Sequence, residues 1–377
     1  MIRLAQVIDT FEADFLAQYR SQLTSDHYRA LGAIKHCRTQ ASAKMQVQCV
    51  KCEHHKLVPH SCGHRHCPHC QHHESQQWLE RQIKRLVPTA YFMITFTLPA
   101  EFRALATAHQ SVVYDLLMRC SWETVRTFSQ NDQQLQGMPG AIAVLHTNTR
   151  RLDYHPHVHL VMPAAAVNAK QKQWRTKRCD KGKGKGKGKG EGGYLFNHKA
   201  LAKVFRAKVL AAIKVAGLTL PCRYPQKWVV DCKAVGSGEA ALIYLGRYLY
   251  RGVIRENDIL ACDDGQVRFR YRHAKSGKME TRTLPGAQFL WLVLQHVLPK
   301  GFRRARNFGF LHPNCKRLIA LVQVLLKWIP TQARGWMKTR PPMLCTCCGA
   351  VMIIVKTRIR SAPAAVMPTR IVVAGVQ

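Results

Sequence analysis

The chain has 377 residues, enough for two or three domains, and 47% of them are hydrophobic, enough for a packed core. Its 58 Lys and Arg residues against 21 Asp and Glu residues give a net charge of +37 at pH 7. This excess is more than solubility requires and favours a densely anionic partner, with nucleic acid as the first candidate. No apolar run reaches the roughly 18 residues of a membrane-spanning helix, so we expect a soluble protein with no membrane partner.

The first predicted element is a helix over residues 2–28, in which apolar side chains recur every three to four positions. A cysteine-rich segment follows it. Cys49 and Cys52 form one CxxC pair, and Cys67 and Cys70 form a second. Two such pairs make the ligand set of a tetrahedral structural Zn²⁺ site, because a closed set of thiolates favours zinc over other metals.

The other cysteines of this region also indicate metal binding. Fifteen cysteines in a chain without a signal peptide indicate metal ligands rather than disulfides. Cys62 and His66 lie between the two pairs and offer a second zinc site or replacement ligands for the first. We therefore expect residues 1–86 to form a small helical zinc-binding domain that contacts DNA, with a purely structural clip as the alternative.

The middle of the chain, residues 87–255, predicts an α+β domain. Its elements follow the order strand, helix, strand, strand, helix, strand, which is that of the split βαβ or ferredoxin-like fold. The expected strands are 90–98, 140–146, 155–162 and 227–232, and the expected helices are 101–130, 199–216 and 237–251. A run of Lys-Gly repeats interrupts the domain, and we expect residues 179–193 to be a disordered loop.

The third of these strands begins with the sequence His-Pro-His-Val-His. Because side chains alternate across a strand, His155, His157 and His159 point to one face. Imidazoles side by side on one face form an open site for a divalent metal. A run of solvated or core-satisfied histidines is the competing interpretation, and it is weakened by the strict alternation ahead of an apolar run.

The last helix of the middle region carries Tyr244 and Tyr248, four positions apart. Residues at this spacing share a helix face, so both phenols can reach one site. Tyrosines spaced in this way more often pack in a core, and it is the combination with the histidine strand that favours chemistry. Arg247, Arg251 and Arg255 follow at spacing four and are candidate contacts for DNA phosphates, with a solvated basic face as the alternative.

Residues 256–340 predict a C-terminal α/β extension. Two strands, 266–271 and 280–284, precede an apolar helix at 288–298. Residues 341–377 contain a further CxxC motif, Cys345 to Cys348, followed by an apolar tail. The motif has the form of a zinc knuckle, but no second cysteine pair lies close to it in the sequence.

Taken together, these motifs resemble the rolling-circle insertion-sequence transposases of the two-tyrosine type, which belong to the HUH single-strand endonucleases. The matching stretches are His-Cys-Pro-His-Cys ending at Cys70, His-Pro-His-Val-His at 155–159 and Tyr-Leu-Gly-Arg-Tyr at 244–248. The similarity covers roughly residues 23–327. It implies an N-terminal zinc-binding domain joined to a ferredoxin-like HUH nuclease core.

The resemblance also implies a mechanism. His157 and His159 would hold a catalytic Mg²⁺ or Mn²⁺, and Tyr244 and Tyr248 would attack DNA to give a 5′-phosphotyrosine and a free 3′-OH. The partner would be single-stranded DNA at the element ends and at the target. The motifs do not fix a third metal ligand. The candidates are His155, Asp231 and Glu239, and His155 is favoured because it shares the strand face.

Two other functions fit the same motifs. One is a non-catalytic, zinc-containing nucleic-acid-binding protein in which the histidines and tyrosines are core residues. The other is a replication initiator or relaxase with the same nuclease chemistry. For the transposase we expect a cytoplasmic, nucleoid-associated location in a bacterial cell.

Overall fold

The structure is a computed structural model that describes residues 1–178, 194–249, 252–274, 276–330 and 342–359. The expected loop at 179–193 lies outside the described residues. The chain divides into two compact units, which are considered separately. Residues 1–35 and 63–338 form the large unit, and residues 36–62 and 339–377 form the small unit. No helix in the described part of the chain has both the length and the apolar character needed to cross a membrane.

The described elements of the large unit are helices and antiparallel strands in a mixed α/β arrangement. The helices are α1 (Leu4–Tyr19), α2 (Ser25–Lys35), α3 (His72–Ile83), α4 (Arg103–Ala108), α5 (Gln110–Asn131), α6 (His198–Val215), α7 (Glu239–Leu249), α8 (Gly286–Leu294) and α9 (Lys316–Leu325). The strands are β3 (Tyr91–Thr97), β4 (Met138–Asn148), β5 (Tyr154–Pro163), β6 (Ala165–Asn168), β7 (Gln173–Thr176), β8 (Val230–Ala234), β9 (Ile259–Asp263), β10 (Gln266–Arg272), β11 (Met279–Pro285) and β12 (Ala305–Gly309).

The main sheet has the strand order β7-β6-β4-β5-β3-β8, and β12 pairs with β4. Its two longest strands, β4 and β5, pair in an antiparallel register that places His146 opposite His157 and Val144 opposite His159. On its other side, β5 pairs with β3, so that Thr95 lies opposite His159. This register decides which polar side chains can meet on the sheet.

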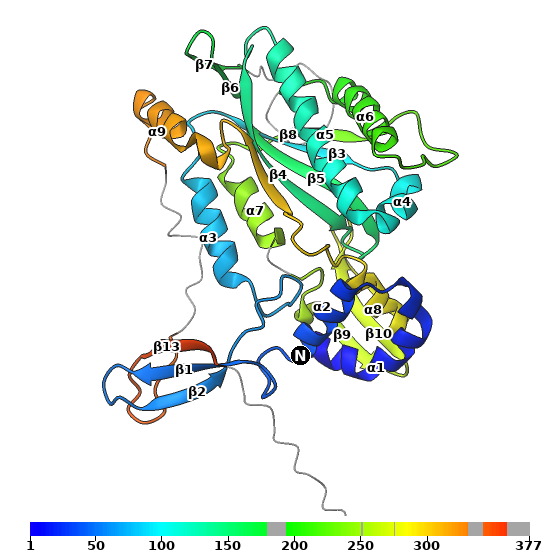
Figure 1. The fold of residues 1–377 in the computed structure, drawn as a ribbon, viewed down its shortest axis with the longest axis vertical. Helices are drawn as coiled ribbons and strands as arrows, with labels where there is room; N and C mark the ends of the chain where they lie inside the picture. Colours follow the sequence, from blue (N-terminus) through cyan, green and yellow to red (C-terminus); the bar gives the residue numbers. More distant parts are fainter. Residues whose placement is uncertain (179–193, 250–251, 275, 331–341, 360–377) are drawn as a thin grey trace, which may run out of the picture. The chain divides into compact units, whose positions relative to one another are not determined.

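Each face of the main sheet is covered by helices (Figure 1). Helices α5 and α6 cover one face, and their core includes Val158 and Leu160 of β5. Helices α3 and α7 lie over the other face, and their core includes Val161 of β5. Because side chains alternate along β5, His157 and His159 share the face of Val161 and lie on the side of α7.

The start of α7 depends on a glycine. Gly238 has a φ of +84°, a conformation that other residues rarely adopt, and its backbone carbonyl accepts the hydrogen bond from Leu242 N at the start of the helix. A Cβ at this position would lie 2.6 Å from the ring of Tyr91 in β3. The close approach holds the start of α7 against the strand that neighbours β5.

A second sheet, in the order β11-β10-β9, packs with α8, and α8 packs with the N-terminal helix α1. The apolar face of α1 is buried, with Phe11 against Gly286 at the start of α8. Tyr19 stacks on Trp291 of α8 with ring centroids 5.0 Å apart. The first helix therefore belongs to the large unit, since its apolar stripe needs a partner that residues 36–86 do not supply.

The small unit is a three-stranded antiparallel sheet in the order β13-β1-β2, made of β1 (Lys44–Cys49), β2 (His55–Pro59) and β13 (Met352–Ile359). Its buried residues are Val47, Cys49, Cys345 and Met352. Strand β13 comes from the end of the chain and pairs with β1 from near its beginning. The expected boundary at residue 86 therefore differs from the observed units.

Candidate metal and tyrosine site

Three imidazoles meet on the α7 face of the main sheet. One potential ligand atom from each of His146, His157 and His159 lies within 4.8 Å of the others. Strand β5 supplies His157 and His159, whose ring centroids are 4.9 Å apart. Strand β4 supplies His146, whose ring centroid is 4.3 Å from that of His159. The pairing of β4 with β5 thus converts a two-histidine motif into a three-imidazole cluster.

The rings are held by contacts that leave nitrogens free for a metal. His157 Nδ1 donates to the carbonyl oxygen of His155 at 2.6 Å, and His159 Nδ1 lies 2.9 Å from Thr95 Oγ1. Such contacts fix the orientation of metal-binding imidazoles and leave Nε2 available. His146 Nε2 is buried and has no hydrogen-bond partner among the described residues, which suits a nitrogen that coordinates a cation.

The imidazoles are also in the protonation state that metal binding requires. Burial lowers the pKa of His157 to about 4 and that of His159 to about 3. Burial, reinforced by the other two imidazoles, lowers the pKa of His146 well below its usual value. Since only a neutral imidazole has a lone pair to donate, all three rings can bind a metal at neutral pH.

The third imidazole is His146, and His155 is not in the cluster. The His155 ring centroid lies 5.3 Å from that of His157, and its Nδ1 is 3.5 Å from the Arg103 guanidinium. Asp231 pairs with Lys233 at 2.9 Å, and Glu239 lies in the first turn of α7. His146 could have been found from the sequence as the last residue of the strand expected at 140–146, had the hairpin register been worked out.

The structure brings both predicted tyrosines of α7 to the imidazole cluster. The Tyr248 ring stacks on His146 with centroids 3.4 Å apart and planes inclined by 15°, and its hydroxyl donates to Asn148 Oδ1. The Tyr244 ring centroid is 6.3 Å from that of His159, and 47% of its surface is exposed. The two phenols thus reach one site in different states, one enclosed and one facing solvent.

Arg304, which directly precedes β12, lies beside Tyr248. The guanidinium carbon of Arg304 is 4.9 Å from the centre of the Tyr248 ring, and Arg304 Nε donates to the Leu145 carbonyl at 2.9 Å. Burial raises the pKa of Tyr248 to about 12, and the charge of Arg304 opposes this rise. Arg304 therefore favours the anionic form of the phenol that burial disfavours.

The imidazoles and phenols open into a cleft of about 670 Å³ whose lining also includes residues of β10. Arg247, one of the three expected phosphate contacts, is exposed in the last turn of α7. Arg251, the second, lies outside the described residues. Arg255 lines the cleft, and its Nε lies 2.6 Å from Asp258.

Four cysteines meet in the small unit. Cys49 Sγ is 3.4 Å from Cys348 Sγ, and Cys52 Sγ is 3.6 Å from Cys345 Sγ. The backbone N–H groups of Cys52 and Lys51 point at Cys49 Sγ and lower the pKa of that thiol to about 6. Four convergent sulfurs, one of them stabilised as a thiolate, fit a tetrahedral Zn²⁺.

The pairing of cysteines differs from the one expected from the sequence. Cys49 and Cys52 were paired with Cys67 and Cys70, but the structure places them with Cys345 and Cys348. The reason is the pairing of β1 with β13, which carries the C-terminal CxxC motif to the first one.

The imidazole of His66 is engaged elsewhere, because its Nε2 accepts a hydrogen bond from Leu298 N at 3.2 Å. Among the described residues, His66 is not one of the clustered candidate metal ligands. Burial lowers its pKa well below the usual value, so the ring is neutral and suited to accepting that bond.

Two family models match the chain. The model described as "Transposase zinc-binding domain" matches residues 7–98, and the model described as "Putative transposase" matches residues 140–318. The chain is 32% identical over 332 residues to the "Putative transposase y4qJ" of Sinorhizobium fredii, covering 82% of this chain and 80% of that protein. It is 27% identical to the transposase for insertion sequence element IS801 of Pseudomonas savastanoi, covering 80% of this chain and 76% of that protein.

Among solved structures, the conjugative relaxase TrwC in complex with mutant oriT DNA matches with a TM-score of 0.25 and 20% identity. The match covers 37% of this chain and 48% of the relaxase chain.

Proposed function

Because the chain belongs to the IS91-type family of rolling-circle transposases, we propose that its imidazole cluster and its two α7 tyrosines are the machinery that cuts and rejoins DNA. His146, His157 and His159 would hold the catalytic divalent ion, and Tyr244 and Tyr248 would be the nucleophiles. The observation that carries this proposal is the meeting of three neutral imidazoles with two phenols, from segments about a hundred residues apart in the chain.

The donor set fits a divalent cation. A bound Mg²⁺ or Mn²⁺ would neutralise and orient the scissile phosphate. Nitrogen ligands suit manganese better than magnesium, which prefers carboxylates and water, so three imidazoles favour Mn²⁺ over Mg²⁺. Thr95 and the His155 carbonyl keep the rings of His159 and His157 in the orientation that this role requires.

The tyrosines would perform the strand cleavage. The phenol oxygen attacks the phosphorus, the bond from phosphorus to the 3′ oxygen breaks, and that oxygen leaves as a 3′-OH after taking up a proton. The 5′ end of the DNA stays joined to the tyrosine through a phosphodiester. Attack by a 3′-OH on this link reverses the step, so rejoining needs no ATP.

Residues around Tyr248 would prepare it for this role. Its hydroxyl donates to Asn148, which fixes the direction of the oxygen. Arg304 offsets the burial that raises the pKa of the phenol, and it is placed to compensate negative charge on a nearby phosphate. Tyr244, which faces solvent, is free to engage a second DNA end.

We further propose that the large unit has the ferredoxin-like arrangement expected from the sequence. The strand order β4-β5-β3-β8, with α5 and α6 on one face, supports it. This arrangement leaves the opposite face of β5 open to α7. We also propose that Cys49, Cys52, Cys345 and Cys348 hold one zinc ion of the protein.

The proposal is tested by incubating the full chain with a labelled oligonucleotide that carries an element end, either as a single strand or as a duplex. We expect a denaturant-resistant protein–DNA adduct and a released 3′-OH fragment with the single strand and Mn²⁺ or Mg²⁺. We expect neither product after chelation, and a much lower yield with the duplex. If DNA binds but no adduct forms with any metal or end, the chain is a non-catalytic binder and the proposal fails.

A further inference from the structure

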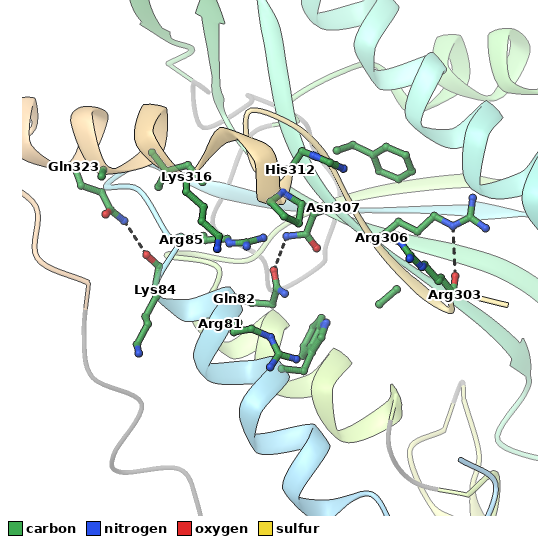
Figure 2. A pocket seen from close by; sticks show the side chains of 16 residues that line it. Arg81, Gln82, Lys84, Arg85, Arg303, Arg306, Asn307, His312, Lys316 and Gln323 are labelled. Atoms are coloured by element: carbon green, nitrogen blue, oxygen red, sulfur yellow. Dashed lines mark hydrogen bonds between the residues drawn. The ribbon is translucent and has the colours of Figure 1, made fainter. Parts of the chain in front are cut away.

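The large unit has a second cavity, whose lining residues are all distinct from those of the cleft with the imidazoles and tyrosines. It has a volume of about 1010 Å³ and lies between the end of α3, the strand β12 and the start of α9. Figure 2 shows the side chains that line it. The apolar part of the lining includes Trp78, Phe308 and Ile319. We call this cavity the basic groove.

The basic groove is lined by six Lys and Arg residues and, among the described residues, by no Asp or Glu. The six are Arg81, Lys84, Arg85, Arg303, Arg306 and Lys316. Arg306 is engaged with Asp115 at 2.7 Å, and Arg85 donates to the Leu311 carbonyl at 3.2 Å. Burial, and then the charge of Arg81, lowers the pKa of Arg85, as expected where like charges gather.

The other four cations are exposed: Arg81, Lys84, Arg303 and Lys316. Within the described residues none of these four forms an ion pair. Exposed cations around a concave surface, with no carboxylate among them, repel one another unless an anion lies between them. An extended polyanion suits this arrangement better than a small anion, because the cations come from three separate segments of the chain.

The basic groove comes close to Tyr248, which lines the cleft with the imidazoles, at the start of β12. Arg304 lies over the ring of Tyr248, while its neighbours Arg303 and Ala305 line the groove. Strand β12 pairs only with β4 among the described strands, so its outer edge is open to the groove. A DNA strand whose phosphate sits at Tyr248 is therefore within reach of the cations of the groove.

We propose that the basic groove binds the phosphodiester backbone of the DNA that continues from the scissile bond. This inference rests on the proposed function only in taking DNA as the substrate. The side chains that line the groove offer charge and amides, so we expect contacts to phosphates that depend little on sequence. The flanking DNA is either a single strand or a duplex, and the backbone chemistry is the same for both.

The test uses the full chain with three exposed groove cations replaced: Arg81→Gln, Arg303→Gln and Lys316→Gln. The matched control carries the same charge change on α6, at the other face of the sheet: Lys199→Gln, Lys203→Gln and Lys214→Gln. Binding is measured with three oligonucleotides: one that spans only the cleavage site, one with a long single-stranded flank, and one with a duplex flank. Each is titrated over a range of salt concentrations.

We expect the groove variant to bind a long-flank oligonucleotide at least tenfold more weakly than the control variant does. The plot of log K against log salt should be shallower by about 2, at roughly 0.7 per lost phosphate contact on a single strand. The flank that shows the loss identifies the strand state that the groove binds. Equal affinity of the two variants for both flanks overturns the proposal.

Two further measurements keep the outcome interpretable. Single replacements of Arg303 or Lys316 should each give a smaller loss in the same direction, which guards against misfolding of the triple variant. The wild-type chain is also tested for adduct formation with the short oligonucleotide. Its failure there would count against the proposed cleavage chemistry, whereas the affinity difference between the two triple variants tests the groove alone.

Discussion

His146 differs from the other two imidazoles of the cluster in how it is held. It is 1% exposed, lies between His159 and Tyr248, and has no hydrogen-bond partner for Nε2 among the described residues. An unpartnered buried nitrogen is costly unless something binds it. A cation shared with His157 and His159 would offset that cost, which makes His146 the residue on which the proposed metal site depends most.

The first prediction compares His146→Ala with His155→Ala. We expect the His146 variant to lose at least about tenfold in Mn²⁺ affinity, since a direct ligand matters at least as much as a residue that orients one. The His155 variant should change little, because the His155 backbone carbonyl, which orients His157, remains. Metal affinity is measured by calorimetry and adduct yield by gel. An equal effect of both variants would contradict the assignment of the third ligand.

A second residue-scale prediction concerns His296, which lies away from the metal cluster. Its Nε2 donates to the Leu152 carbonyl at 3.0 Å, its ring stacks on Tyr154, and Arg304 and Asp153 are the nearby charges. Burial is the main cause that lowers its pKa to about 4. His296 therefore takes up a proton near pH 6.5 in the unfolded chain but only near pH 4 in the folded chain. As the pH falls through this range, protonation favours the unfolded chain, so the free energy of unfolding decreases.

Lowering the pH from 7 to 5 should reduce the free energy of unfolding by about 2 kcal/mol through the protonation of this histidine. His296→Gln keeps a donor for Leu152 but cannot titrate. The free energy of unfolding should therefore fall less between pH 7 and pH 5 in His296→Gln than in the wild-type chain, by about that amount. Denaturant unfolding at both pH values measures it, and an unchanged difference would show that His296 is not the group responsible.

At the scale of elements, the small unit depends on the pairing of β1 with β13. Three strands with four buried residues form a small core, and such a unit normally needs a metal or a disulfide. The four cysteines lie where the two distant segments meet, so a zinc ion there would join the beginning and the end of the chain. This links metal content to the folding of the small unit.

The corresponding prediction uses a cysteine that lies inside the motif but outside the cluster. Cys345→Ser should lower the zinc content of the full chain by one ion and lower the melting temperature of the small unit. Cys347→Ser is the matched control, since Cys347 is exposed and is not among the four clustered thiols. The zinc content per chain is measured by inductively coupled plasma mass spectrometry. Loss of zinc from both variants, or from neither, would contradict the proposed ligand set.

The sequence predicted the elements of the main sheet better than it predicted the cysteine pairing. Strand β5 and helix α7 lie where alternation and helical spacing placed them, because those patterns are local. The partners of Cys49 and Cys52 could not be found in this way. They lie about three hundred residues away, and the nearest CxxC motif in the sequence is the wrong one. His146 was missed for a related reason, since its role depends on the register of β4 against β5.

At the scale of the whole molecule, the net charge of +37 predicted a nucleic-acid partner but not where it would bind. In the described structure, two regions of the large unit are candidates for contact with DNA. In the proposed function the cleft with the imidazoles and tyrosines carries the chemistry, while the basic groove carries four exposed cations that form no ion pair among the described residues. Arg304, over the ring of Tyr248, and Arg303, in the lining of the groove, are adjacent residues directly before β12.

The central claim is that residues from β4, β5 and α7 act together on one phosphate. The most direct measurement is to digest the covalent protein–DNA adduct and identify, by mass spectrometry, the peptide that carries the nucleotide. We expect the nucleotide on Tyr244 or Tyr248, and no adduct when both are replaced by Phe. A nucleotide on any other residue, or an undiminished adduct in the double variant, would contradict the account.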